Sequence, residues 1–306
     1  MPSRAASGIL LVDKPLGITS HDVVSRIRRL AGTRKVGHAG TLDPLATGLL
    51  IIGVESSTRL LTYIVGADKE YTATIRLGSS TTTDDAEGQE LGRAPAAALE
   101  RVSESDIRRV MARLTGRIEQ VPSAVSAIKV DGKRAYARVR AGEDVQLAGR
   151  PVTVSTFELG EIRSTGGYLD AEVRVECSSG TYIRALARDL GMGLGVGGHL
   201  TALRRTRVGV FRIEDAAALD TLDVDARRLN PAEAAGRLFP VYRLDAQQAV
   251  DLGHGKRVLA SVPQPEGPVA AIAPEGRLVG LVEFTGTEGR SIVNFPPDAP
   301  DAEPAP

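Results

Sequence analysis

Two stretches of the chain alternate between apolar and polar residues, and this period of two predicts β-strands with one buried face. In residues 71–77, Tyr71 and every second residue after it are apolar, with Thr and Arg between them. In residues 171–177, charged side chains occupy the alternate positions. Neighbouring side chains of a strand point to opposite faces, so each stretch suits a sheet that packs one face on a core.

The rest of the first 239 residues predicts helices and strands in irregular order. Ser20 is expected to cap a helix that ends before Gly32, and Ser103 with Asp106 forms an approximate capping box for another. Further buried strands are expected at 9–13, 49–54 and 208–213, a further helix at 182–190, and a surface excursion at 79–98. Because helices and strands do not alternate, the pattern favours a mixed, mostly antiparallel α+β domain over a parallel βαβ fold.

The pattern changes near residues 225–245. After an expected helix at 246–252, only short strand candidates follow, separated by Gly and Pro turns. This is typical of a small β-barrel-like domain. We therefore predict a first domain over 1–239, a second over 240–295 and a disordered tail over 296–306, which is rich in Pro, Asp, Ala and Glu.

Charge is unevenly distributed along a chain whose net charge is zero. Residues 240–306 contain 5 basic and 9 acidic side chains, which leaves 33 basic and 29 acidic in residues 1–239. The segment 126–150 is locally basic, with Lys129 and five further Lys or Arg against three acids, and 204–207 is a second basic cluster. Both segments are candidates for nucleic-acid contact, and solvated helix or strand faces are the alternative.

Several classes of site are excluded or disfavoured. Cys177 is the single cysteine, so neither an internal disulfide nor a metal site with several Cys ligands can form. The four His are scattered, and we expect no metal. No apolar run is long enough for a membrane helix or a signal peptide, so a soluble cytoplasmic protein without membrane contact is expected.

Two segments could carry chemistry. Asp43 lies in a stiff Gly-, Thr- and Pro-containing loop, residues 38–48, that can hold a carboxylate in a fixed place, although a simple turn-capping role is the alternative. Arg184 follows a Gly-Thr-Tyr turn at the start of the expected helix, and a surface arginine without function is the alternative. The glycine pattern of residues 193–198 follows a helix, not a strand, and is rejected as a dinucleotide fingerprint.

Six blocks in order resemble one family. They are GILLVDKPLGITSHDVV (8–24), HAGTLDPLATG (38–48), KEY (69–71), VPSAVSAIK (121–129), SGTYIR (179–184) and HLTALRR (199–205). Over residues 8–215 the chain closely resembles the TruB family of tRNA pseudouridine-55 synthases. The C-terminal region has no comparably specific motif, but by position it looks like the small PUA-like RNA-binding domain of that family.

The resemblance implies the pseudouridine synthase fold and an isomerase that needs no cofactor. Its substrate would be the T stem-loop of tRNA, bound by a monomer, in which one uridine becomes pseudouridine. It implies that Asp43 is the catalytic carboxylate, that Tyr71 stacks on the target base and helps to remove the C5 proton, and that Arg184 pairs with Asp43. The resemblance also assigns His38, Tyr182 and Leu203 to the pocket or the RNA contact, Lys129 and segment 126–150 to gripping the RNA, and Lys14 to supporting the core beneath the site.

Three routes stay open for Asp43: attack on the sugar, attack on the base, or removal of a sugar proton before elimination. Two other functions also remain as alternatives. An N-ribosyl hydrolase would use Asp43 as nucleophile and release free uracil. A non-catalytic tRNA-binding folding factor would need the basic segments but no positioned carboxylate.

Overall fold

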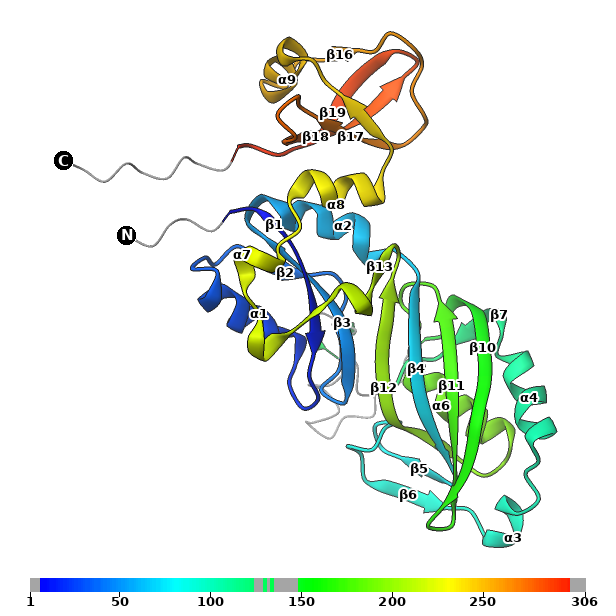
Figure 1. Cartoon of the computed structure of the whole chain (residues 1–306). Coiled ribbons are helices and arrows are strands. Elements are labelled where there is room, and N and C mark those ends of the chain that lie inside the picture. Colours follow the sequence, from blue (N-terminus) through cyan, green and yellow to red (C-terminus); the bar gives the residue numbers. More distant parts are fainter. Residues whose placement is uncertain (1–5, 124–128, 131–132, 135–147, 298–306) are drawn as a thin grey trace. The chain divides into compact units, whose positions relative to one another are not determined.

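The computed structural model describes residues 6–123, 129–130, 133–134 and 148–297 of the 306-residue chain (Figure 1). The chain forms two compact units and passes between them four times. The first unit consists of Met1–Asp43, Leu49–Val65 and Val210–Pro306, and the second of Pro44–Gly48 and Gly66–Gly209.

The second unit is built on an antiparallel sheet with the strand order β12-β4-β11-β10-β7. These strands are β4 (Lys69–Leu77), β7 (Gly116–Gln120), β10 (Arg150–Thr165), β11 (Tyr168–Cys177) and β12 (Gly198–Val208). Two short hairpins accompany them: β5 (Ser79–Thr81) with β6 (Glu90–Arg93), and β8 (Lys129–Val130) with β9 (Lys133–Arg134). The predicted strands at 71–77 and 171–177 are confirmed as parts of β4 and β11, which are direct neighbours.

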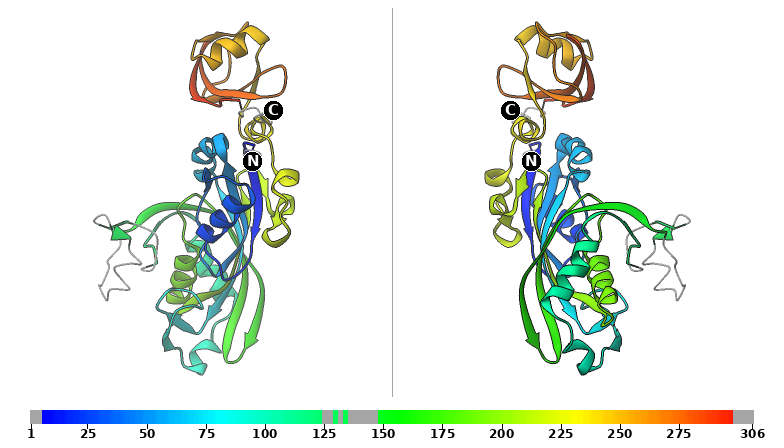
Figure 2. Two further views of the ribbon diagram at one scale, coloured as in Figure 1. Left: turned by 90° about the vertical axis from the view of Figure 1, so that its left-hand side faces the viewer. Right: turned by 90° about the vertical axis from the view of Figure 1, so that its right-hand side faces the viewer.

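Helices cover one face of this sheet (Figure 2). The helix α6 (Ile183–Gly193) packs against β12 and β4, and α4 (Glu104–Arg113) packs against β10 and α6. A short helix, α3 (Ala96–Leu99), precedes α4. The predicted capping box of α4 is confirmed, because the Ser103 hydroxyl accepts from the Asp106 amide and the Asp106 carboxylate accepts from the Ser103 amide.

In the first unit β1 (Gly8–Lys14) lies between β14 (Ala217–Ala218) and β3 (Ala46–Val54). Strand β2 (Val36–His38) is antiparallel to β3, and helix α1 (Ser20–Leu30) packs against β2. The remaining elements of this part are β13 (Phe211–Arg212), the 3-10 turns Glu55–Leu60, Ile213–Asp215 and Leu219–Thr221, and the helices α2 (Leu61–Val65), α7 (Val224–Arg227) and α8 (Pro231–Leu238). Strand β14 runs parallel to β1, so the sheet is mixed, although most of its strand pairs are antiparallel.

The C-terminal strands form a curled half-barrel sheet with the order β15-β17-β18-β19-β16, as expected for a PUA-like domain (Figure 2). The elements are β15 (Val241–Arg243), α9 (Ala246–Gly253), β16 (Val258–Leu259), β17 (Pro268–Ile272), β18 (Leu278–Thr285) and β19 (Glu288–Asn294). Leu252 of α9 packs with Val258, Val279 and Val282 in its core. The boundary at residue 240 remains a prediction, and residues 298–306 of the expected tail lie outside the described residues.

Two local predictions are wrong. Thr19, not Ser20, caps α1, because the Thr19 hydroxyl accepts from the Asp22 amide while Ser20 is buried and bonded elsewhere. Residues 208–213 do not form one strand: β12 ends at Val208, and Gly209, at φ 54°, turns the chain before the short β13.

Candidate active site

The loop that carries Asp43 is anchored immediately before that residue. The Ser20 hydroxyl donates to the carbonyl oxygen of Leu42 at 3.0 Å and accepts from the Leu42 amide at 2.8 Å. Ser20 is the first residue of α1 and is buried, so the helix fixes the loop backbone in both hydrogen-bonding directions. Asp43 is partly exposed at the end of this anchored stretch.

The residues that follow Asp43 are anchored by the second unit's sheet. The start of β3 pairs in parallel with β12, with Ala46 opposite Leu203 and Gly48 opposite Arg205. Gly48 has φ 100°, and a Cβ there would lie 2.3 Å from the carbonyl oxygen of Arg205. Only glycine permits both the left-handed conformation and this close approach of the two backbones.

Strand β12 joins this anchor to the strand that carries Tyr71. Arg205 is opposite Tyr71 across the β12–β4 pair, and Leu203 is opposite Ala73. Tyr71 and Leu203 are both buried, at 8% and 9% exposure, and lie on the same face of neighbouring strands. The backbones of Gly48 and Tyr71 are two strand spacings apart, about 10 Å.

Arg184 is buried in the first turn of α6, not on the surface. Its Nη1 atom lies 3.4 Å from Oδ2 of Asp85 and donates to the carbonyl oxygen of Thr83 at 3.1 Å. The side chains are only 6% and 3% exposed, and Oδ1 of Asp85 also accepts from the Glu87 amide. The expectation that residues 79–98 form a surface excursion is therefore wrong for Asp85, which is buried. The predicted pairing of Arg184 with Asp43 remains a prediction.

Tyr182 is the N-cap residue of α6 and is held by a glutamine from the edge strand β7. The Gln120 side chain donates to the carbonyl oxygen of Tyr182 at 3.1 Å and accepts from its amide at 2.8 Å. This pair of bonds reproduces the bonding of a neighbouring strand and fixes the backbone two residues before Arg184. Sequence reasoning missed Gln120, whose only signal was its position directly before the block 121–129.

A second arginine, one turn further along α6, holds the segment that follows β7. Arg188 donates to the carbonyl oxygen of Val121 at 2.7 Å and lies 3.2 Å from the carboxylate of Asp84. The same carboxylate oxygen accepts from the buried Ser123 hydroxyl at 2.7 Å. These contacts tie the last described residues before position 124 to the helix that carries Arg184.

The remaining predicted site residues have different surroundings. Lys14 is fully buried at the end of β1 and donates to the carbonyl oxygens of Pro15 and Ile18 at 2.9 and 2.7 Å, so it supports the turn that leads into α1. His38 ends β2 and is partly exposed. Lys129 belongs to β8, but its side chain lies outside the described residues.

Two ionisable groups beside Tyr71 have shifted pKa values. Burial, with a smaller contribution from the nearby Arg205, lowers the pKa of Lys69 to about 8. The Thr206 hydroxyl donates to Glu70, and with Arg174 it holds the pKa of that carboxyl below its ordinary value. Within the described residues, no group of three or more His, Cys, Asp or Glu is arranged to hold a metal ion, and no helix is long and apolar enough to cross a membrane.

Three family models match the chain. The model described as "TruB family pseudouridylate synthase (N terminal domain)" matches residues 28–183. "tRNA pseudouridylate synthase B C-terminal domain" matches residues 184–236, and "tRNA Pseudouridine synthase II, C terminal" matches residues 239–296.

Curated relatives and solved structures agree with these matches. A protein of Leifsonia xyli subsp. xyli named tRNA pseudouridine synthase B is 66% identical over 95% of this chain and 97% of its own length. One of the same name from Arthrobacter sp. is 55% identical over the same shares. A chain in "Structure of H/ACA RNP bound to a substrate RNA containing 2'-deoxyuridine" has a TM-score of 0.68 and 25% identity, covering 95% of this chain and 85% of its own.

Proposed function

The chain belongs to the TruB family of pseudouridylate synthases, and from this premise we propose that it converts one uridine in the T loop of tRNA to pseudouridine. As an isomerase acting on a tRNA uridine, it breaks the bond between C1′ and N1 and forms a bond between C1′ and C5. The C5 proton leaves and N1 gains a proton, so the reaction is redox-neutral. The support for this proposal is that relatives named tRNA pseudouridine synthase B align with this chain over nearly their whole length.

Asp43 is the catalytic carboxylate in this proposal. Its support is the double anchoring of the loop: Ser20 holds Leu42 before Asp43, and β12 holds Ala46–Gly48 after it. A carboxylate on such a loop is positioned in advance of substrate binding, as precise chemistry at the C1′–N1 bond requires. Arg184 orients this carboxylate, through the planar guanidinium that suits carboxylates.

Tyr71 and Leu203 hold the target base after it leaves the RNA stack. Extrusion of a base costs a few kcal/mol, and stacking on an aromatic ring returns about 1–3 kcal/mol. Support comes from their shared face on neighbouring strands. Tyr182 and His38 line the pocket, and Lys129 with segment 126–150 contacts the T stem-loop.

The experiment is incubation of the purified protein with unmodified tRNA, followed by base-resolved mapping of pseudouridine and measurement of free uracil. We expect one modified T-loop uridine, no released uracil, and loss of product in Asp43→Asn with tRNA affinity kept. Asp225→Asn, at an 88% exposed side chain, is the matched control and should react like wild type. Released uracil would instead support the hydrolase, and binding without any product would support the folding factor.

A further inference from the structure

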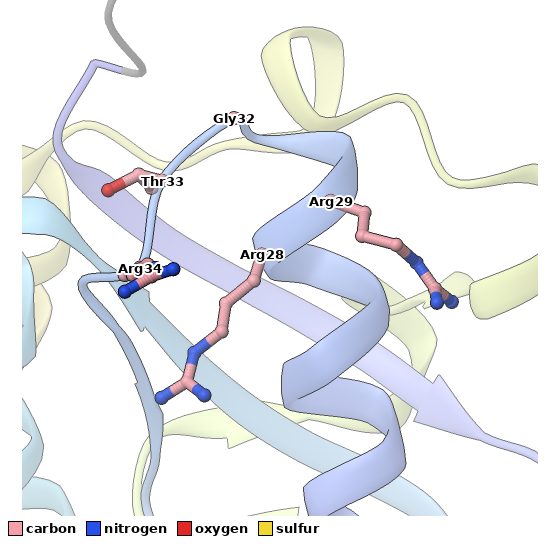
Figure 3. Close-up of a pocket in the computed structure, with 5 residues that line it drawn as sticks. All are labelled: Arg28, Arg29, Gly32, Thr33 and Arg34. Atoms are coloured by element: carbon pink, nitrogen blue, oxygen red, sulfur yellow. The ribbon is translucent and has the colours of Figure 1, made fainter.

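An open hollow of about 600 Å³ lies at the C-terminal end of α1, in the first unit. Its lining is Arg28, Arg29, Gly32, Thr33 and Arg34, and Figure 3 shows Arg28 and Arg34 on one side of the end of the helix and Arg29 on the other. None of the residues that line the hollow has a role in the proposed function.

The three arginines have no acidic partner among the described residues. Arg26, on the same helix, pairs with Asp220, and Arg184 pairs with Asp85. By contrast, Arg28 donates to the carbonyl oxygen of Val36, and its Nε is a buried donor without a partner in the described part of the chain. Guanidinium groups without acidic partners are favourable places for an anion to bind.

A carboxylate beside Thr33 does not neutralise this group. Glu55 accepts a hydrogen bond from the Thr33 hydroxyl, and Lys35 lies 3.6 Å from its other oxygen. Glu55 is only 9% exposed, and its two oxygens already contact Thr33 and Lys35. Arg29 and Arg34, which are exposed, therefore face solvent with donors available for a ligand.

The chain leads directly from this hollow to the proposed catalytic loop. Strand β2 begins two residues after Arg34 and ends at His38, and Asp43 follows five residues later. The stretch of chain from Arg34 to Asp43 spans at most about 30 Å. A phosphate held at the hollow can thus belong to the same RNA whose base reaches Asp43.

We propose that this hollow binds a backbone phosphate of the RNA substrate, away from the nucleotide that reacts. The inference rests on the proposed function, because it takes tRNA as the ligand. The guanidinium fork matches phosphate oxygens, and such a contact positions the RNA without reading its sequence. The contact adds affinity equally to the bound substrate and to the transition state, so it lowers KM and leaves kcat unchanged.

The test compares the double variant Arg29→Gln/Arg34→Gln with wild type, leaving Arg28 and its bond to Val36 in place. We expect the Kd for unmodified tRNA to rise at least about tenfold, since hydrogen bonds to charged groups are strong. The log–log salt slope should become shallower by about 0.7–0.9 for each phosphate that the variant no longer neutralises. The rate at saturating tRNA and the modified position should stay those of wild type.

The matched control is Arg108→Gln/Arg163→Gln, which removes two exposed arginines that already pair with Glu104 and Glu161. This control should bind tRNA like wild type. A Kd and slope in the Arg29/Arg34 variant equal to those of the control would overturn the inference while wild-type product formation still upheld the proposed function. Binding of inorganic phosphate that depends on Arg29 and Arg34, with tRNA binding unaffected by their loss, would also overturn it, since the hollow would then be a site for small anions.

Discussion

Lys69 and Cys177 lie opposite each other on β4 and β11, and burial moves their pKa values in opposite directions. The pKa of Lys69 falls from 10.5 to about 8, because a buried ammonium group is poorly solvated. The pKa of Cys177 rises from 9.0 to about 11, because a buried thiolate is disfavoured. Folding therefore favours the uncharged form of both groups.

The first prediction concerns the pH dependence of stability. Between pH 8 and 10.5 the unfolded chain holds a proton on Lys69 that the folded chain has lost, so the free energy of unfolding from this group rises with pH. From pH 9 to 11 the folded chain keeps the thiol proton that the unfolded chain loses, so Cys177 contributes the opposite slope. The free energy of unfolding, measured with denaturant, should rise between about pH 7.5 and pH 9 in wild type. In Lys69→Met this rise should be absent. An equal slope in both proteins would contradict the assignment, and Cys177→Ala serves to remove the opposing contribution.

The second prediction is that Gly48→Ala destabilises the protein by at least about 2 kcal/mol, through the left-handed backbone and the clash with Arg205. Gly92→Ala is the control: it has open space and no positive φ, so its effect should be neutral or slightly stabilising. Chemical denaturation measures both. A Gly48→Ala protein as stable as the Gly92→Ala protein would show that β3 and β12 can separate without cost.

The third prediction concerns the buried ion pair. Asp85→Asn removes the buried carboxylate that lies 3.4 Å from the guanidinium of Arg184, so the free energy of unfolding should fall by about 3 kcal/mol or more. Product formation should fall as well, because the guanidinium of Arg184 is no longer fixed by its partner. Glu104→Gln, which breaks an exposed pair with Arg108, should cost no more than about 0.5 kcal/mol. Similar losses of unfolding free energy in the two variants would show that the buried Arg184–Asp85 pair contributes no more to stability than an exposed pair.

The fourth prediction separates the two roles of Tyr71. Tyr71→Phe keeps the ring, so tRNA affinity and fold should be preserved, whereas the rate at saturating tRNA should fall about 100-fold or more if the hydroxyl moves the C5 proton. Tyr71→Ala should weaken binding and also lower stability, since Tyr71 is buried. Full activity in the Phe variant would remove the hydroxyl from the mechanism and leave the ring as a stacking surface.

The fifth prediction concerns the basic segment 126–150. Replacing Lys129, Lys133 and Arg134 by Ala should raise the Kd for tRNA and make its salt slope shallower by about 0.7–0.9 for each phosphate left without its cation. The modified position should not change, because phosphate contacts carry no sequence information. Binding measured over a salt series decides, and an unchanged slope would mean that these side chains only keep the segment solvated.

Local patterns were sufficient for much of the fold. Alternation located β4 and β11, and the Ser103–Asp106 pair located the start of α4, since these signals lie within a few residues of sequence. The cap of α1 was misplaced by one residue because Thr19 and Ser20 both suit that role, and only the contact of Ser20 with Leu42 decides between them. Strand β12 was not predicted, because its consecutive arginines interrupt the alternation of apolar and polar residues.

The candidate site was less predictable, because its contacts join distant segments. Asp85 lies in a polar stretch that has the composition of a surface loop, and its partner Arg184 lies about 100 residues later. Gln120 and Tyr182 are separated in the same way. No periodicity connects such pairs, so only the tertiary structure reveals that a buried carboxylate and a glutamine hold the start of α6.

The pairing of β1 with β14 has a consequence for synthesis on the ribosome. Val12 and Asp13 find their partners Ala217 and Ala218 about 200 residues later, and Ile9 is bridged to Leu229. At about 5–20 residues per second, the N-terminal strand waits about 10–40 s for these partners to be translated. The segment Gly66–Gly209 emerges complete during that interval. The order of translation thus favours the unit with Tyr71 and Arg184 as the first to be complete. Strand β1 can pair with β3 early, but its other edge stays open until β14 has been made.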